Sequence, residues 1–228
     1  MANIDEEIRT QFPNYTTLSS MDFNREHDLW ERRMYQGNPV FQTLKLTYGD
    51  ATKGKVTTRQ QIIDLFAAGK YYDGYLCALV WGNIGTYQGG RARFEAAFST
   101  PRNDLETRIA NIKALIEENK LEEAFCSMFP GGDNNLPGLG VSFFTKILYF
   151  VGATVNCNIK PLIFDITSLK ILNRLYRDAG AQKKARQTKK HYVWFCTKMK
   201  ELSDSAHMDL PTPGHLEAFL FNSGNILV

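Results

Sequence analysis

The chain has 228 residues, of which 43% are apolar, 12% aromatic and 22% charged, which is an ordinary balance for a globular protein. A chain of this length and balance can bury a sizeable core, which excludes a disordered chain, a collagen-like chain and a disulfide-stapled mini-protein. The net charge of +3 is small for a nucleic-acid binder, so any basic binding surface must be local.

No stretch of about 20 apolar residues is present, so we expect no membrane-spanning segment and no membrane partner. The start, MANIDEEIRTQF, is acidic and polar and lacks the basic and apolar regions of a signal peptide, which favours a cytoplasmic protein. The four cysteines are widely spaced and form no CxxC pair, so we expect reduced thiols and no metal site.

The first half of the chain predicts helices separated by short breaks. Asp22 is suited to cap the first helix, Thr57 or Thr58 the second, and Gly69 follows the second. Residues 40–56 alternate weakly and fit a loop or a short hairpin. Three further helical segments are YYDGYLCALVWGN, the apolar stripe that follows Asn103, and LEEAFCSMF, which we expect to stay helical until Pro130.

The second half continues in the same way. GGDNNLPGLG predicts a loop, a helix is expected over 141–151, and the connector GATVNCNIKP leads to Asp165. The remaining helices are expected from 166 to a C-cap at Gly180, over about 181–207, and over about 215–221. These signals give about ten helices and at most a token sheet, so the fold class is all-α and residues 1–228 are expected to form a single unit.

The helix VSFFTKILYFV is apolar around most of its circumference, which is typical of a helix inside a protein. Its polar residues form one narrow stripe at helical spacing: Ser142, Thr145, Lys146 and Tyr149. Lys146 is therefore a single ammonium on a buried helix. Either it reaches solvent or pairs with a carboxylate, or it faces a cleft in which desolvation leaves it a usable amine nucleophile.

Two further features flank this helix. Gly138 and Gly140, in LPGLGV, can take positive φ and expose backbone amides at the positive end of the helix dipole, which suits a nucleic-acid phosphate; a plain tight turn explains the same pattern. Asp165 follows the apolar run PLIF at the start of the next helix. It is suited to be an N-cap, or a carboxylate that stabilises positive charge on a sugar.

An LPGLG hairpin that opens an apolar helix, a lysine on that helix and an aspartate that begins the next one resemble the helix-hairpin-helix DNA glycosylase superfamily. FTKILYF followed by PLIFD is most similar to bacterial 8-oxoguanine DNA glycosylase OGG-fold proteins. The matching segment, the hairpin and catalytic region, lies within about 130–178. The resemblance implies about ten helices with a cleft between two helical subdomains.

The resemblance also implies a mechanism. Gly138 and Gly140, with Ser142 beside them, would contact a phosphate of duplex DNA, with no cofactor except a monovalent cation often found at the family's hairpin. Lys146 would attack C1′ of a flipped nucleotide and form a Schiff base, Asp165 would stabilise the sugar cation, and β-elimination would follow. The family's lysine usually stands where this chain has Ser142, one turn before Lys146. Lys146 is therefore a displaced nucleophile, or Ser142 marks a monofunctional enzyme that uses water.

Other candidate contacts carry two interpretations each. The basic run KKARQTKK is a solvated helix face or a DNA phosphate contact; its lysines are Lys183, Lys184, Lys189 and Lys190. Arg91 and Arg93 are surface residues or phosphate contacts. The candidate base-pocket residues are Trp81, Tyr149 and Phe219, although aromatic residues such as the first and last more often belong to the core. Glu217 is a partner for a buried base such as Lys146, or exposed.

The sequence thus predicts a DNA N-glycosylase with AP-lyase activity that excises a modified, 8-oxoguanine-like purine. The alternatives are a non-catalytic helix-hairpin-helix DNA-binding protein and a component of a defence complex. The last follows from the resemblance alone, since some relatives of that type occur in antiphage defence operons whose products would be partners.

Overall fold

A computed structural model describes residues 58–82, 90–178, 188–204 and 213–223 of the chain. Within these ranges every regular element is an α-helix and no strand occurs, so the all-α prediction is confirmed. The helix predicted after Asp22, the ambiguous segment 40–56 and the C-cap predicted at Gly180 lie outside the described residues.

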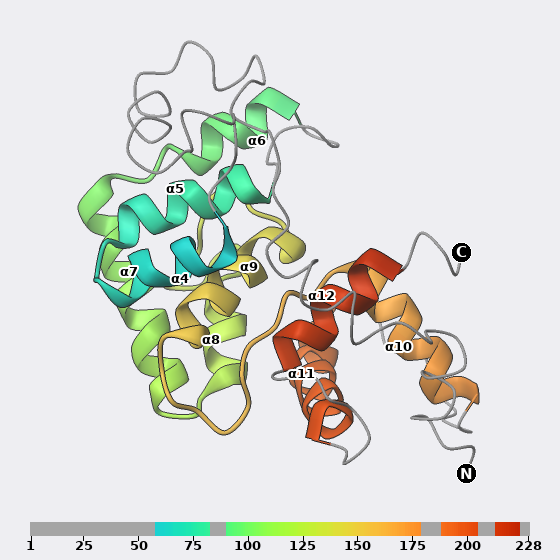
Figure 1. Ribbon diagram of the computed structural model, residues 1–228. Helices are drawn as coiled ribbons and strands as arrows, with labels where there is room; N and C mark the ends of the chain where they lie inside the picture. The colour runs from blue at the N-terminus through green and yellow to red at the C-terminus, as the bar shows by residue number, and fades with distance from the viewer. Residues whose placement is uncertain (1–57, 83–89, 179–187, 205–212, 224–228) are drawn as a thin grey trace, which may run out of the picture.

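The described helices form two groups that lie side by side in Figure 1. The first group is α4 (Arg59–Ala67), α5 (Tyr71–Trp81), α6 (Gly90–Ala97), α7 (Arg102–Glu117), α8 (Leu121–Ser127) and α9 (Val141–Ala153). The second group is α10 (Ile166–Asp178), α11 (Lys189–Asp204) and α12 (Pro213–Ser223). The chain crosses from one group to the other through residues 154–165, between α9 and α10.

Helix α9 is the central element of the first group, since it packs against α4, α5, α7 and α8. Its apolar residues explain that place, because a helix that is apolar almost all round is stable only when other elements cover it. Two of the covering helices are α5, which is almost wholly buried, and α7, and they also pack against each other. The buried stripe of α7 consists of Leu105, Ile109, Ile112 and Ile116.

Aromatic side chains join the two groups of helices. Tyr192 of α11 stacks on Phe125 of α8, with ring centroids 4.1 Å apart and an interplanar angle of 14°. Phe164, from the crossing segment, packs against Tyr192, Phe125 and Phe195 of α11. Because aromatic pairs add to the free energy of burial, this cluster holds the crossing segment against both groups.

Helix boundaries differ from the predictions where local signals compete. Thr58 caps α4 in a reciprocal capping box with Gln61, as its position predicts. Asn119, with φ 60°, breaks the chain between α7 and α8, and α8 ends at Ser127 rather than Pro130. Thr188 is a bend, so the described part of the predicted 181–207 helix begins only at Lys189.

None of the helices in the described ranges has both the length and the apolar composition needed to cross a bilayer.

Candidate functional site

The loop that precedes α9 is held by its own amide side chains. Asn134 is buried; its side chain donates to Ser127 Oγ (3.0 Å) and accepts from Asn111 Nδ2 (3.3 Å). Asn135 donates from its side chain to the carbonyl of Met128 (2.9 Å), and its own carbonyl accepts from Arg108. The sequence GGDNN therefore makes an ordered turn that fixes where α9 begins.

The two glycines of the hairpin behave differently. Gly138 has φ +76°, and a Cβ there would lie 2.8 Å from the backbone nitrogen of Ala97 and closer to the carbonyl of Arg93, so only glycine fits against α6. Gly140 is the N-cap of α9 in an extended conformation, with φ −80°. The expectation of positive φ is therefore wrong for Gly140, because an N-cap residue takes a β-region conformation.

Gly140 offers no side chain to cap α9, and a Cβ at that position would meet nothing within 4 Å. Helix N-termini without a side-chain cap present backbone amides and a partial positive charge to an approaching anion. The hairpin thus has the geometry expected for a phosphate contact, and that contact stays a prediction.

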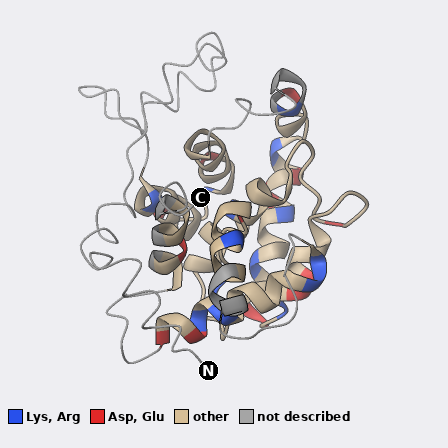
Figure 2. Cartoon of the chain, turned by 90° about the vertical axis from the view of Figure 1, so that its right-hand side faces the viewer, with Lys and Arg blue, Asp and Glu red and all other residues tan. Residues whose placement is uncertain are grey.

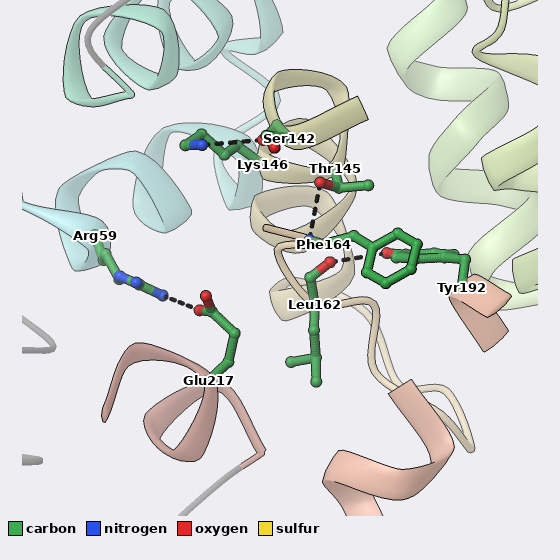
Figure 3. A network of polar contacts seen from close by, with 8 residues as sticks. All are labelled: Arg59, Ser142, Thr145, Lys146, Leu162, Phe164, Tyr192 and Glu217. Carbon is green, nitrogen blue, oxygen red and sulfur yellow. Dashed lines mark hydrogen bonds and ion pairs between the residues drawn. The ribbon is translucent and has the colours of Figure 1, made fainter. Parts of the chain in front are cut away.

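Lys146 is partly buried on α9, and its side chain runs back towards the start of the helix. Its Nζ donates a hydrogen bond to the carbonyl of Ser142 at 3.0 Å and lies 4.9 Å from the ring centroid of Phe143 (Figure 3). Its stem lies against Gly82 at the end of α5, where an added Cβ would stand only 2.9 Å from Lys146 Cδ. A glycine after α5 thus leaves the space that the lysine stem occupies.

The segment that carries Asp165 is fixed by two contacts with α9 and one with α11. Buried Thr145 accepts a hydrogen bond from the backbone nitrogen of Phe164 at 3.0 Å, and Tyr192 donates to the carbonyl of Leu162 at 3.0 Å (Figure 3). Pro161 packs so closely on Gly152 that a Cβ there would come within 2.5 Å of its Cδ. The position of Asp165 relative to α9 is therefore set by packing and by buried hydrogen bonds.

Asp165 caps α10. Its Oδ1 accepts a hydrogen bond from the backbone nitrogen of Thr167 at 2.8 Å, and its carbonyl accepts from Leu169 at 3.0 Å. The N-cap interpretation of Asp165 is thus correct, and no hydrogen bond from the described residues occupies its second carboxylate oxygen.

A buried ion pair lies next to this segment and joins the two groups of helices. Arg59 Nη1 of α4 and Glu217 Oε2 of α12 are 3.3 Å apart, and both side chains are at most 5% exposed. The Arg59 guanidinium also lies over the rings of Trp81 (4.8 Å) and Tyr149 (5.1 Å). The direct partner of Glu217 is therefore Arg59, a residue that the sequence patterns did not single out.

The charges of this cluster act on Lys146. Burial lowers the pKa of Lys146 below its ordinary value, and the positive charge of Arg59 lowers it further, whereas the carboxylates of Asp165 and Glu217 raise it. Burial dominates, so the Lys146 amine loses its proton more easily than an exposed lysine does. Lys146 and Asp165, 19 residues apart, are thus close enough in space for their charges to interact.

The remaining predicted contacts are only partly placed. Trp81 packs edge-on against Phe150, with ring centroids 5.5 Å apart, and its buried indole Nε1 has no hydrogen-bond partner among the described residues. Tyr149 is 5% exposed. The side chains of Phe219 and Arg91 lie outside the described part of the chain, while Arg93 is exposed.

Of the basic run, Lys189 and Lys190 are exposed at the start of α11, and Lys189 Nζ lies 4.6 Å from the ring centroid of Phe129, just before the hairpin. Lys183 and Lys184 fall outside the described residues. In Figure 2, basic and acidic positions are interspersed over the described helices.

No group of three or more histidine, cysteine, aspartate or glutamate side chains suited to hold a metal occurs among the described residues. A monovalent cation at the hairpin would depend on main-chain carbonyls and stays a prediction.

A family model described as "Putative 8-oxoguanine DNA glycosylase OGG-like protein" matches residues 16–221. The chain belongs to this OGG-like family. The match covers the helices described above except for the last two residues of α12, so the hairpin, Lys146, Asp165 and the Arg59–Glu217 pair all lie within the OGG-like region. Comparison with curated proteins and with solved structures gives no match.

Membership of the OGG-like family points to an enzyme of the DNA glycosylase class with DNA as its substrate. Sequence patterns singled out the hairpin, Lys146 and Asp165 within it but missed Arg59. One signal for Arg59 exists: it is the first residue of α4, where the helix dipole disfavours a cation, so another interaction must hold it there.

Proposed function

We propose that this protein excises a modified purine from DNA, with Lys146 as the nucleophile, and then cleaves the strand as an AP lyase. The observation that carries the proposal is the proximity of Lys146, a lysine of lowered pKa, to the carboxylate of Asp165 at the N-terminus of α10. Nucleophilic attack on a sugar requires an amine that deprotonates readily, and a nearby carboxylate supports that attack.

The direction of the Lys146 side chain supports this residue over Ser142 as the nucleophilic position. Long side chains on a helix point towards its N-terminus, so a lysine four residues later places its amine near the preceding turn. The 3.0 Å hydrogen bond from Lys146 Nζ to the Ser142 carbonyl has this geometry. The amine thus lies beside the position at which the superfamily usually carries its lysine.

The proposed reaction begins with neutral Lys146. Its lone pair attacks C1′ of a flipped nucleotide, the bond from C1′ to the base breaks, and the base leaves with the bonding electrons and takes up a proton. The nitrogen gives up a proton and O4′ leaves C1′ to become a hydroxyl, which forms a Schiff base. Loss of a C2′ proton then breaks the C3′–O3′ bond, and the 3′ phosphate departs.

Asp165 would stabilise the positive charge that develops on the sugar, because a fixed carboxylate in a desolvated site acts more strongly than one in water. The amides of Gly138 and Gly140 and the exposed Lys189 and Lys190 would contact DNA phosphates. Flipping of the base, the identity of the purine and any partners from a defence operon are predictions that go beyond family membership.

Borohydride trapping tests the proposal. The full chain is incubated with labelled duplexes that contain 8-oxoguanine, uracil, an abasic site or no lesion, and is then reduced. Hydride addition to the Schiff base carbon converts it into a stable amine, so we expect a covalent adduct with the 8-oxoguanine and abasic duplexes. The adduct should be absent in Lys146→Met and kept in Ser142→Ala.

Other results would replace the mechanism. Alkali-labile sites without an adduct would indicate a monofunctional enzyme that uses water. In that case both wild type and Lys146→Met would produce alkali-labile sites. DNA binding without an adduct or labile sites, unchanged in Lys146→Met, would identify a binding protein and overturn the proposal.

The phosphate contacts have a separate readout. Each lysine that neutralises a phosphate adds about one unit to the salt dependence of binding. Replacement of Lys189 and Lys190 by glutamine should therefore reduce that slope by about two, and an unchanged slope would assign both lysines to the solvated surface.

A further inference from the structure

The buried Arg59–Glu217 pair is costly to the fold. Both side chains are at most 5% exposed, their charged atoms are 3.3 Å apart, and the two residues lie 158 positions apart in the sequence. Removal of two charges from water is expensive, and apolar residues of similar volume often replace such a pair with no loss of stability. The pair therefore calls for an explanation other than stability.

The position of Arg59 in its helix supports the same argument. It is the first residue of α4, where the positive end of the helix dipole repels a cation. The rings of Trp81 and Tyr149, at 4.8 and 5.1 Å, hold the guanidinium there together with Glu217. Despite burial, the attraction of Glu217 and the contact with Tyr149 raise the pKa of Arg59, so its charge is kept at all relevant pH values.

The same residues surround Lys146. Trp81 is followed by Gly82, and the stem of the Lys146 side chain lies against the backbone of Gly82. Tyr149 lies one turn after Lys146 on α9. The described charges that reach Lys146 are Arg59 from α4, Asp165 from the start of α10 and Glu217 from α12. The element α5 contributes only the uncharged Trp81 and Gly82 at this point. Arg59 and Glu217 thus act on Lys146 with opposite sign.

We propose that Arg59 and Glu217 are positioning residues for Lys146: a buried pair of opposite charges that fixes α4 and α12 around the lysine and balances its charge. This inference rests on the proposed role of Lys146 as the nucleophile. A direct reading of the substrate base by the pair is disfavoured, because each charged group is buried and engaged by the other.

The decisive variant removes both charges together. Arg59→Met with Glu217→Leu keeps side chains of similar size and leaves no lone buried charge, so we expect it to fold at least as stably as wild type. We also expect it to lose about tenfold or more of the trapping rate, because small displacements of a reacting group are costly. A stable double variant with the wild-type trapping rate would overturn the inference.

Single variants supply a readout that a purely structural role would not move. In Glu217→Gln the charge that raises the pKa of Lys146 is lost, so labelling of Lys146 by an amine-reactive reagent should begin at lower pH. In Arg59→Met a charge that lowers this pKa is lost, so labelling should begin at higher pH, and Arg59→Lys should restore the wild-type profile. Shifts in the same direction, or none, would contradict the inference.

A matched control is the exposed ion pair of α7, between Arg102 and Glu106 at 2.9 Å, with exposed fractions of 62% and 31%. Glu106→Gln should change neither the labelling profile nor the trapping rate. The labelling experiment also separates the two proposals, since it reports the titration of Lys146 in the full chain without substrate. Opposite shifts in a protein that forms no adduct would refute the nucleophile and keep the electrostatic coupling.

Discussion

Gly152→Ala is predicted to damage the protein through the segment that carries Asp165. The added methyl would lie 2.5 Å from Pro161 Cδ and closer to Cγ, whereas ordinary contact begins at 3.4 Å, so the proline must move by at least about 0.9 Å. Overpacking of this kind costs about 1–3 kcal/mol. For a chain of this size that corresponds to a loss of about 2–12 °C in Tm.

The displacement should matter for activity as well as for stability. Pro161 is four residues before Asp165, and the hydrogen bonds from Tyr192 to Leu162 and from Phe164 to Thr145 connect that segment to α11 and α9. A shift of about 1 Å in a positioned group costs on the order of 100-fold in rate, so we expect trapping of the abasic duplex to fall by up to that factor.

Differential scanning calorimetry and borohydride trapping measure the two effects in one preparation. Ala153→Ser is the control, since Ala153 is exposed at the last position of the same helix and its substitution should leave both quantities unchanged. A Gly152→Ala protein with wild-type Tm would show that Pro161 yields freely and would refute the packing argument.

Three further predictions follow from buried hydrogen bonds and charges. Thr145→Val should cost about 1–3 kcal/mol in urea unfolding, because the Phe164 amide loses its acceptor, and Thr145→Ser should recover most of that loss. Asp165→Asn should abolish trapping but keep Tm within about 1 °C, because asparagine caps a helix as well as aspartate does. Asp165→Ala should abolish trapping and also lose about 0.5–2 kcal/mol of stability. Equal Tm losses in the two variants would contradict the role of Asp165 as a cap. The folded state lowers the pKa of Lys146, so between that lowered value and the ordinary one the unfolded chain binds more protons and stability rises with pH. Lys146→Met should therefore be more stable than wild type at pH 7, and its stability should not rise with pH in the same way. Urea unfolding at pH 7 and pH 9.5 measures this, and an equal difference in unfolding free energy between the two proteins at both pH values would refute it.

The helices could be predicted where the signal was local. The stripe of α7 and the apolar circumference of α9 are properties of ten to fifteen consecutive residues, and both helices were found. The ends of the helices could not be predicted in the same way, because they depend on backbone conformations such as φ 60° at Asn119. They also depend on neighbouring elements such as α6, which leaves no room for a side chain at Gly138. The residues that make these contacts show no local sequence pattern from which the contacts could be predicted.

The site divides in the same way. Lys146 and Asp165 belong to one continuous segment and could be singled out from composition, spacing and resemblance. Glu217 was noticed as an isolated acid, but its partner Arg59 is 158 residues away, and no local pattern connects the two. Such a pair becomes visible only when α4 and α12 are placed together by the fold.

Under the proposed mechanism, the offset of the lysine means that the location of the amine is a better guide to the nucleophile than the position of its residue. Four residues of α-helix rise about 6 Å, and an extended lysine stem spans a comparable distance in the direction of the N-terminus. Lys146 uses that reach, since its amine bonds to the carbonyl of Ser142. A lysine one turn after position 142 can therefore place its Nζ close to where a lysine at position 142 would place its own. This requires that the neighbouring helix leaves space for the longer path of the lysine stem. Gly82, the residue that follows α5, provides that space, which links the departure from the usual lysine position to a glycine 64 residues earlier in the chain.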